Sequence, residues 1–303
     1  MRTARWAYRG TAVRVTVTDP ADLTGARRLV TTELSAMTRV CSPGRTDTEL
    51  SQVHRAAGRP VRISSRLTGL LRAALGCAAL TDGDVDPTVG MAILRLRLQR
   101  PWLPRYGSSI ETGRADGDWR SVVLRTGWLT VPASVVLDLG AVTRAYTAQR
   151  CADLLAARYG NGALVGLGRC VATAGLLPAE GWPVSLDGER IMLAGAAVAT
   201  SSGLDRDPPG SGIIDPRTGR PPEPLWASVS VVATGCAAAK ALSAAAVLRG
   251  YDAVPWLESL GVAARLVTVD GTRKSVGAWA EWPGTWPAWH PGPTLPPARP
   301  RHS

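Results

Sequence analysis

The sequence predicts an α+β protein, because segments with helical periodicity and segments with strand periodicity alternate along its 303 residues. The clearest strand is Ala12–Thr18, in which apolar and polar residues alternate. The clearest amphipathic helix is Ala21–Arg39, and Asp19-Pro20 marks its start. With 45% hydrophobic residues, the chain is long enough and apolar enough to bury a large core.

The remaining segments continue this alternation of helices and strands. Further helices are predicted at Thr48–Ala57, Ser64–Thr81, Thr88–Leu98, Ala141–Tyr159 and Gly235–Gly250. Predicted strands are a hairpin over Ser121–Val131, then Val135–Leu139, Ala163–Leu167, further short strands through Ala199, Ala227–Val232, and a last hairpin from Ala264. Loops are expected at Pro101–Gly117 and Asp205–Gly212. We expect one domain over residues 1–281 and a Pro/Trp-rich tail over 282–303 that is extended or disordered.

Composition and charge exclude several classes of protein. The formal net charge is +11, but the basic residues are scattered arginines apart from Lys240 and Lys274, so no nucleic-acid surface is expected. Five cysteines without a CxxC spacing favour reduced thiols and a cytoplasmic location over a disulfide framework or a zinc site. No apolar stretch is long enough for a signal peptide or a membrane span.

The segment Thr81–Gly90, TDGDVDPTVG, carries acidic residues at positions 82, 84 and 86. It does not match a calcium loop, because its glycine comes too early and no glutamate closes it. The simpler interpretation is that Asp86 caps a helix beginning at Pro87. That interpretation leaves Asp82 and Asp84 unexplained.

Two more segments have the local chemistry of a site. In Val136–Tyr146, VLDLGAVTRAY, a strand ends in an aspartate and a glycine opens a helix, which is an arrangement that suits phosphate. The segment Ile213–Gly219, IIDPRTG, reads as a turn. His54 is the one candidate general base of the histidine type, because the other two histidines lie in the tail, and no Ser-His-Asp or Cys-His arrangement is supported.

Seven segments occur in the order seen in the FAD:protein FMN transferase (ApbE-type flavin transferase) family, which the chain resembles from about Gly10 to Gly277. They are DTELSQVHRAAGRPV, TDGDVDPTVG, LDLGAVTRAYTAQRCADLL, ALVGLGRCVATAG, AVATSSG, GIIDPRTG and SVVATGCAAAKALSAAAVLRG. The resemblance implies two interlocked α/β lobes with mixed sheets and the flavin site between them. It also implies a reaction in which FMN passes from FAD to a Ser or Thr hydroxyl of an acceptor protein, with Mg²⁺ present and AMP released.

The same resemblance implies which positions form the site. It places Asp84, Val85, Asp86, Asp138 and Ile213 at the FAD site. It assigns the backbone carbonyl of Ala141 to the metal, and it leaves Ser243 as a second oxygen there. Arg144 stands where the family usually has Lys, so a positive charge beside the phosphates is kept.

Several positions depart from the family pattern. Lys240 replaces an aspartate and Ala244 a threonine, two residues that ligate Mg²⁺ in the family. The other replacements are Arg9 for a methionine, Pro43-Gly44 for an arginine and an aromatic residue, Cys170 for the aspartate of a GGD segment, and Gly212 for a histidine. An ammonium at a ligand position repels Mg²⁺, which argues against metal-dependent transfer by the family's usual route.

Two functions remain open at this point. In the first, the protein is an enzyme that acts on FAD with Lys240 and Arg144 supplying positive charge in place of the metal. In the second, the site is catalytically degenerate, and the fold serves as a flavin- or nucleotide-binding protein or as a scaffold. For Lys240 there is also a plain alternative, in which its helix face is merely solvated, although apolar neighbours surround it.

Overall fold

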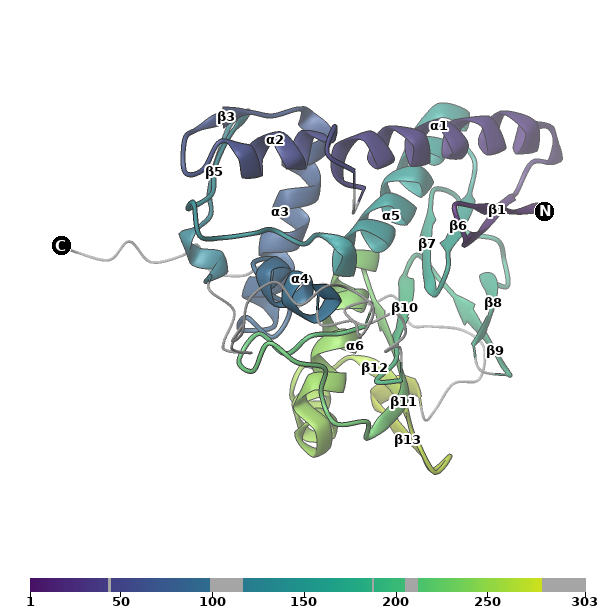
Figure 1. The fold of residues 1–303 in the computed structure, drawn as a ribbon. Helices are drawn as coiled ribbons and strands as arrows, with labels where there is room; N and C mark the ends of the chain where they lie inside the picture. Colours follow the sequence, from purple (N-terminus) through teal and green to yellow (C-terminus); the bar gives the residue numbers. More distant parts are fainter. Residues whose placement is uncertain (43–44, 99–116, 187, 205–211, 280–303) are drawn as a thin grey trace, which may run out of the picture.

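A computed structural model of the chain describes residues 1–42, 45–98, 117–186, 188–204 and 212–279 (Figure 1). Its main feature is an eight-stranded sheet in the order β1-β2-β6-β7-β10-β11-β12-β13, in which every neighbouring pair is antiparallel. The strands are β1 (Arg2–Tyr8), β2 (Thr11–Val17), β6 (Ala163–Leu167), β7 (Cys170–Ala174), β10 (Ala197–Ser201), β11 (Trp226–Ala233), β12 (Ala263–Thr268) and β13 (Arg273–Val276).

Helices and two small sheets complete the fold. The helices are α1 (Leu23–Cys41), α2 (Glu49–Arg55), α3 (Ser65–Leu80), α4 (Gly90–Leu98), α5 (Gly140–Tyr159), α6 (Cys236–Arg249) and α7 (Ala253–Ser259), with single turns of 3-10 helix at Pro20–Asp22, Trp119–Ser121, Gly250–Asp252 and Gly277–Trp279. The small sheets are β3 (Val61–Arg62), β5 (Trp128–Thr130) and β4 (Val123–Arg125), and the hairpin of β8 (Trp182–Leu186) with β9 (Glu189–Leu193).

Helices α5 and α6 link the large sheet to the other helices. Helix α5 packs on β6 and β7, and helix α6 packs on β10 and β11, while both also contact α3 (Figure 1). Alanine fills much of α6, and small side chains let neighbouring elements approach a helix from several sides. This placement explains why the residues from Ala241 to Val247 are all buried.

Most predicted elements are present with their ends shifted by a few residues. Of the two serines at the predicted start of this helix, Ser64 and Ser65, it is Ser64 that caps α3, because its Oγ accepts a hydrogen bond from the backbone N–H of Leu67 at 3.2 Å. The predicted hairpin over Ser121–Val131 is formed by β4 and β5, and Gly127 takes the positive φ of 72° that its turn requires. The α+β class is therefore confirmed.

Three local predictions were incomplete or wrong. Residues Val135–Leu139 do not form a strand; their one β-bridge joins Val136 to Val89, and the apolar side chains at 135, 137 and 139 are buried by packing instead. Helix α4 begins at Gly90, so Asp86 does not cap a helix at Pro87. Strand β1 was not predicted, because RTARWAY lacks a regular alternation of apolar residues.

The start of α4 lies unusually close to the segment at 135–139. A Cβ atom built on Gly90 would come within 2.4 Å of the Val136 carbonyl oxygen, so only glycine fits there. Most of the expected loops at Pro101–Gly117 and Asp205–Gly212 and all of the expected tail at 282–303 lie outside the described residues. The division into one domain and a tail stays a prediction.

Candidate functional site

A cavity of about 470 Å³ lies where α1, α4, α5 and α6 come together with the loop at 84–87. This volume is within the range of about 300–1,000 Å³ that small-molecule sites occupy. Helix α1 contributes apolar side chains, including Leu34 and Met37, whereas Arg144 and Lys240 bring positive charge from α5 and α6. The cavity therefore combines an apolar wall with cationic groups.

Asp84 lies on the cavity wall with its carboxylate held by two arginines. Arg249 donates from Nε to Oδ2 at 2.6 Å, and Arg217 Nη1 lies 3.7 Å from Oδ1. The Arg249 guanidinium also lies over the Trp256 ring, 4.1 Å from its centroid. The Asp84 side chain is only 9% exposed. Through these two arginines it connects the acidic loop to the IIDPRTG turn and to the end of α6.

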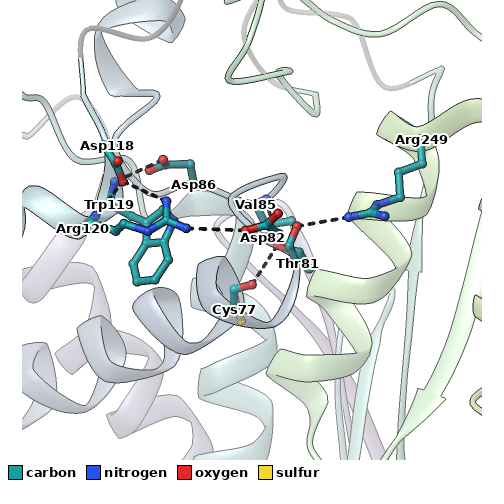
Figure 2. A network of polar contacts seen from close by, with 9 residues as sticks. All are labelled: Cys77, Thr81, Asp82, Val85, Asp86, Asp118, Trp119, Arg120 and Arg249. Carbon is teal, nitrogen blue, oxygen red and sulfur yellow. Dashed lines mark hydrogen bonds and ion pairs between the residues drawn. The ribbon is translucent and has the colours of Figure 1, made fainter. Parts of the chain in front are cut away.

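Asp86 and Val85 are also fixed by hydrogen bonds within the loop. One carboxylate oxygen of Asp86 accepts from the backbone N–H and the hydroxyl of Thr88, both at 2.7 Å. Its other oxygen accepts from the backbone N–H of Trp119 at 3.2 Å, as Figure 2 shows. The Val85 N–H donates to the Thr81 hydroxyl at 3.1 Å. Both residues line the cavity, and these bonds determine the shape of that wall.

Asp138 lies where the buried 135–139 segment meets α5. Its Oδ1 accepts from the backbone N–H of Gly140 at 2.8 Å, so it organises the first turn of the helix. The preceding residue, Leu137, donates its N–H to His54 Nε2 at 3.0 Å. Because Nε2 accepts this bond, His54 is neutral, and burial lowers its pKa although the Asp138 charge partly opposes that shift.

His54 is not among the residues that line the cavity. Its hydrogen bond to Leu137 instead positions the segment that leads to Asp138.

The first turns of α5 bring two predicted residues to the cavity. Ala141 and Arg144 both line it and are exposed. The N-terminus of a helix carries unpaired backbone N–H groups and a partial positive charge, which adds to the charge of Arg144. Ile213 lies on another part of the wall, half-buried and packed against side chains of two hydrophobic clusters.

Lys240 also lines the cavity, and two buried serines hold it. Its Nζ donates to Ser201 Oγ at 2.7 Å, and the Ser201 hydroxyl lies 2.8 Å from the Ser243 hydroxyl. Ser243 Oγ donates to the Lys240 carbonyl oxygen at 3.0 Å. Ser201 and Ser243 are 1% and 0% exposed, and neither lines the cavity. Ala244, one turn after Lys240, presents only a methyl group to the cavity.

Two buried cysteines lie close to this cationic region. A hydrogen bond with Cys236 lowers the pKa of Cys170 to about 7 against the opposing effect of burial, and the charges of Lys240 and Arg144 lower it further. The positive potential of both cavity residues therefore extends to the start of β7. All five cysteines are free and buried.

The structure thus brings together every site residue expected from the sequence except Ser243, which lies just beneath the wall. Sequence reasoning did not find Ser201, Arg249 or the apolar residues of α1. Ser201 is 39 residues from Lys240, and Arg249 is 165 residues from Asp84, so no local pattern links them. Ser201 belongs to AVATSSG, one of the seven ordered segments, but nothing in that segment distinguishes its hydroxyl from those of its neighbours.

Comparison with known proteins gives one family. The family model described as "ApbE family" matches residues 9–266. The curated "FAD:protein FMN transferase" of Treponema pallidum (strain Nichols) is 28% identical over 280 residues, covering 80% of this chain and 77% of that protein.

Solved structures support the same fold. The apo form of flavinyl transferase ApbE from Pseudomonas stutzeri superimposes with a TM-score of 0.79 at 22% identity, covering 93% of this chain and 97% of that one. The ApbE protein of Thermotoga maritima superimposes with a TM-score of 0.75 at 23% identity, covering 93% and 98%. Within the described residues, no helix has the length and apolar character needed to cross a bilayer.

Proposed function

Because this chain belongs to the ApbE family, we propose that it binds FAD in the 470 Å³ cavity and that its reaction is transfer of FMN to a Ser or Thr hydroxyl of an acceptor protein. The observation that carries the proposal is the composition of the cavity wall. An apolar surface from α1 suits a flat aromatic ring, and Lys240 and Arg144 suit a pyrophosphate. The curated relative from Treponema pallidum, an FAD:protein FMN transferase, supports the same reaction.

The proposed reaction is a phosphoryl transfer whose atoms balance. The acceptor hydroxyl oxygen forms a bond to the phosphorus of the FMN half, and the bond from that phosphorus to the bridging oxygen breaks. AMP leaves with the bridging oxygen, and the hydroxyl proton is released to solvent. Negative charge grows on the leaving phosphate, and Lys240 and Arg144 are placed to stabilise it electrostatically.

The other predicted residues would shape the site in this proposal. The loop containing Asp84, Val85 and Asp86, with Asp138 and Ile213, would form the walls against which FAD rests. Asp84 is already held by two arginines, so its part is to fix the wall rather than to move a proton.

The residues at the expected metal position do not fit Mg²⁺. This ion is held by oxygen ligands, and carboxylates or substrate phosphates usually supply them. Here the candidates are the Ala141 carbonyl and the Ser243 hydroxyl, and that hydroxyl is buried and engaged with Ser201 and Lys240. The described residues contain no group of three or more His, Cys, Asp or Glu that could hold a metal. We therefore assign no step to a metal ion.

A second candidate is an FAD-binding protein that does not transfer FMN. The observation in its favour is the pair Lys240 and Ala244, which offers no metal ligand at the centre of the site. Such a protein would act as a flavin-dependent partner or scaffold.

One experiment separates the two candidates. The purified chain is incubated with FAD and an acceptor protein that carries an exposed Thr, and the products are analysed by mass spectrometry and chromatography. Transfer is expected to add one FMN less one water to the acceptor and to release AMP in equal amount. FAD binding without either product would support the second candidate, and absence of FAD binding would contradict both.

The expectations about nucleic acid and location stay predictions. The expectation of no nucleic-acid partner rests on the scattered arginines of the sequence. The cytoplasmic location rests on the free cysteines.

A further inference from the structure

The hydrogen bonds around Lys240 have a fixed direction. Ser243 donates its hydroxyl proton to the Lys240 carbonyl, so the bond between the two serine hydroxyls must be donated by Ser201. Ser201 then accepts from Lys240 Nζ. A serine activated by a lysine would donate its proton to the amine, whereas here Ser201 donates its proton to Ser243. The arrangement is therefore that of an anchored ammonium, not of a nucleophile and its base.

Burial leads to the same conclusion. Ser201 and Ser243 are 1% and 0% exposed, and no substrate reaches them without a change in the fold. Lysine has a flexible four-carbon side chain that adopts many rotamers in solution. The Ser201 hydroxyl contacts the nitrogen at the cavity, and Ser243 in turn bonds to Ser201 and to the Lys240 backbone carbonyl.

The carboxylates on the cavity wall are already engaged. Both oxygens of Asp84 face arginines, and both oxygens of Asp86 accept hydrogen bonds from the loop or from Trp119. Asp138 accepts from the first turn of α5. To ligate a cation, Asp84 and Asp86 would have to give up contacts that hold the wall in shape.

We propose that Lys240, anchored by Ser201 and Ser243, forms with Arg144 a metal-free pyrophosphate site, which holds the diphosphate of FAD without a divalent cation. The proposal rests on FAD binding as the proposed function, and it states which side chains of the same cavity balance the negative charge of the FAD diphosphate. The two phosphates of FAD each carry one negative charge at neutral pH, and the cavity wall carries Arg9 and Arg97 in addition to Lys240 and Arg144. Lys240 and Arg144 both line the same cavity.

The first test compares FAD binding by the unmodified protein in EDTA and in excess Mg²⁺, followed by quenching of flavin fluorescence. The dissociation constant is expected to agree within about twofold between the two conditions. Binding that is tenfold or more tighter with Mg²⁺ would overturn the metal-free site and leave FAD binding intact. Absence of binding in both conditions would overturn the proposed function as well.

The second test uses the two lysines of the chain as a matched pair. Lys240→Met is expected to weaken FAD binding at least tenfold and to leave binding of riboflavin, which lacks the pyrophosphate, unchanged. Lys274→Met, at an exposed position in β13, is the control and should change neither. Equal weakening of FAD and riboflavin would mean that Lys240 supports the fold of the cavity and would contradict the proposal.

Ser201 is proposed as a positioning residue, and its test again compares the affinity for FAD with the affinity for riboflavin. Ser201→Ala is expected to weaken FAD binding threefold to tenfold with riboflavin unaffected, and Ser201→Thr should restore it by supplying the hydroxyl. An unchanged FAD affinity in the alanine variant would remove Ser201 from the site.

The last test restores oxygen ligands at positions 240 and 244. The double substitution Lys240→Asp with Ala244→Thr replaces the ammonium by two oxygen ligands one helical turn apart. FAD binding by this variant is expected to become dependent on Mg²⁺ by tenfold or more. A variant that binds FAD without Mg²⁺ as well as the parent would show that Lys240 does not occupy the place of a cation.

Discussion

Helix α6 presents a basic residue near each end, and the two are held differently. At the C-terminal end, Arg249 donates to the Asp84 carboxylate at 2.6 Å and lies over the Trp256 ring. Near the N-terminal end, Lys240 donates to the Ser201 hydroxyl at 2.7 Å. Arg249 therefore lies against a carboxylate that is 9% exposed, whereas Lys240 lies on the wall of the cavity. We infer from these positions that Arg249 stabilises the fold and that Lys240 contacts a ligand.

If buried ion pairs stabilise the fold, substitution of Glu33 should lower the free energy of unfolding most. Glu33 in α1 is 7% exposed and bonds to Arg66 of α3 at 2.8 Å and to Arg150 of α5 at 3.0 Å. Glu33→Gln leaves two arginines facing a neutral amide and should lower the free energy of unfolding by about 3 kcal/mol. Urea unfolding followed by circular dichroism measures this change.

Asp47→Asn is the control for Glu33, because Asp47 pairs with Arg45 on the surface. It should leave the free energy of unfolding unchanged, because solvent screens an exposed ion pair. Equal effects of the two substitutions would contradict the role assigned to the buried triad.

Arg249→Ala should have the next largest effect. It removes one of the two arginines from Asp84 and the contact with Trp256, so the expected loss is about 2 kcal/mol in the same unfolding measurement. Arg217→Ala is the matched control, because Arg217 is 59% exposed and lies 3.7 Å from the same carboxylate. It should cost below about 1 kcal/mol. The reverse order would mean that the turn, not the helix, holds the acidic loop.

Lys240→Met should leave stability nearly unchanged. A charge placed for a ligand contributes little to folding, so the free energy of unfolding is expected to stay within about 1 kcal/mol of the parent or to rise. A loss as large as that of Arg249→Ala would remove the distinction between the two ends of α6.

The smallest expected effect concerns pH. Burial lowers the pKa of His54, so the folded protein keeps it neutral while the unfolded chain takes up a proton below about pH 6.5. Stability from this group is fully present above that pH and decreases as the pH falls toward the folded pKa. Unfolding measured at pH 7.5 and 5.5 should show the decrease, and His54→Leu should make it smaller. An unchanged slope would mean that His54 is protonated in the fold.

The sequence predicted the elements better than it predicted their contacts. Ser64 capping and the position of α6 follow from local chemistry and periodicity. Val135–Leu139 was predicted as a strand because a short apolar run does not distinguish a ladder from a buried extended segment. Asp86 was predicted as a helix cap, but Trp119, 33 residues away, takes one of its oxygens.

By itself, the sequence determined the family and the substitution of a lysine where a metal ligand is expected. It also determined that α6 is apolar on most of its surface, since alanine and leucine fill it. Only the tertiary structure decided that Lys240 contacts Ser201, because Ser201 lies on β10 and reaches the lysine where α6 packs on the sheet. Hydrogen-bond partners that are distant along the chain come together only when the elements that carry them pack, so local sequence patterns do not predict them.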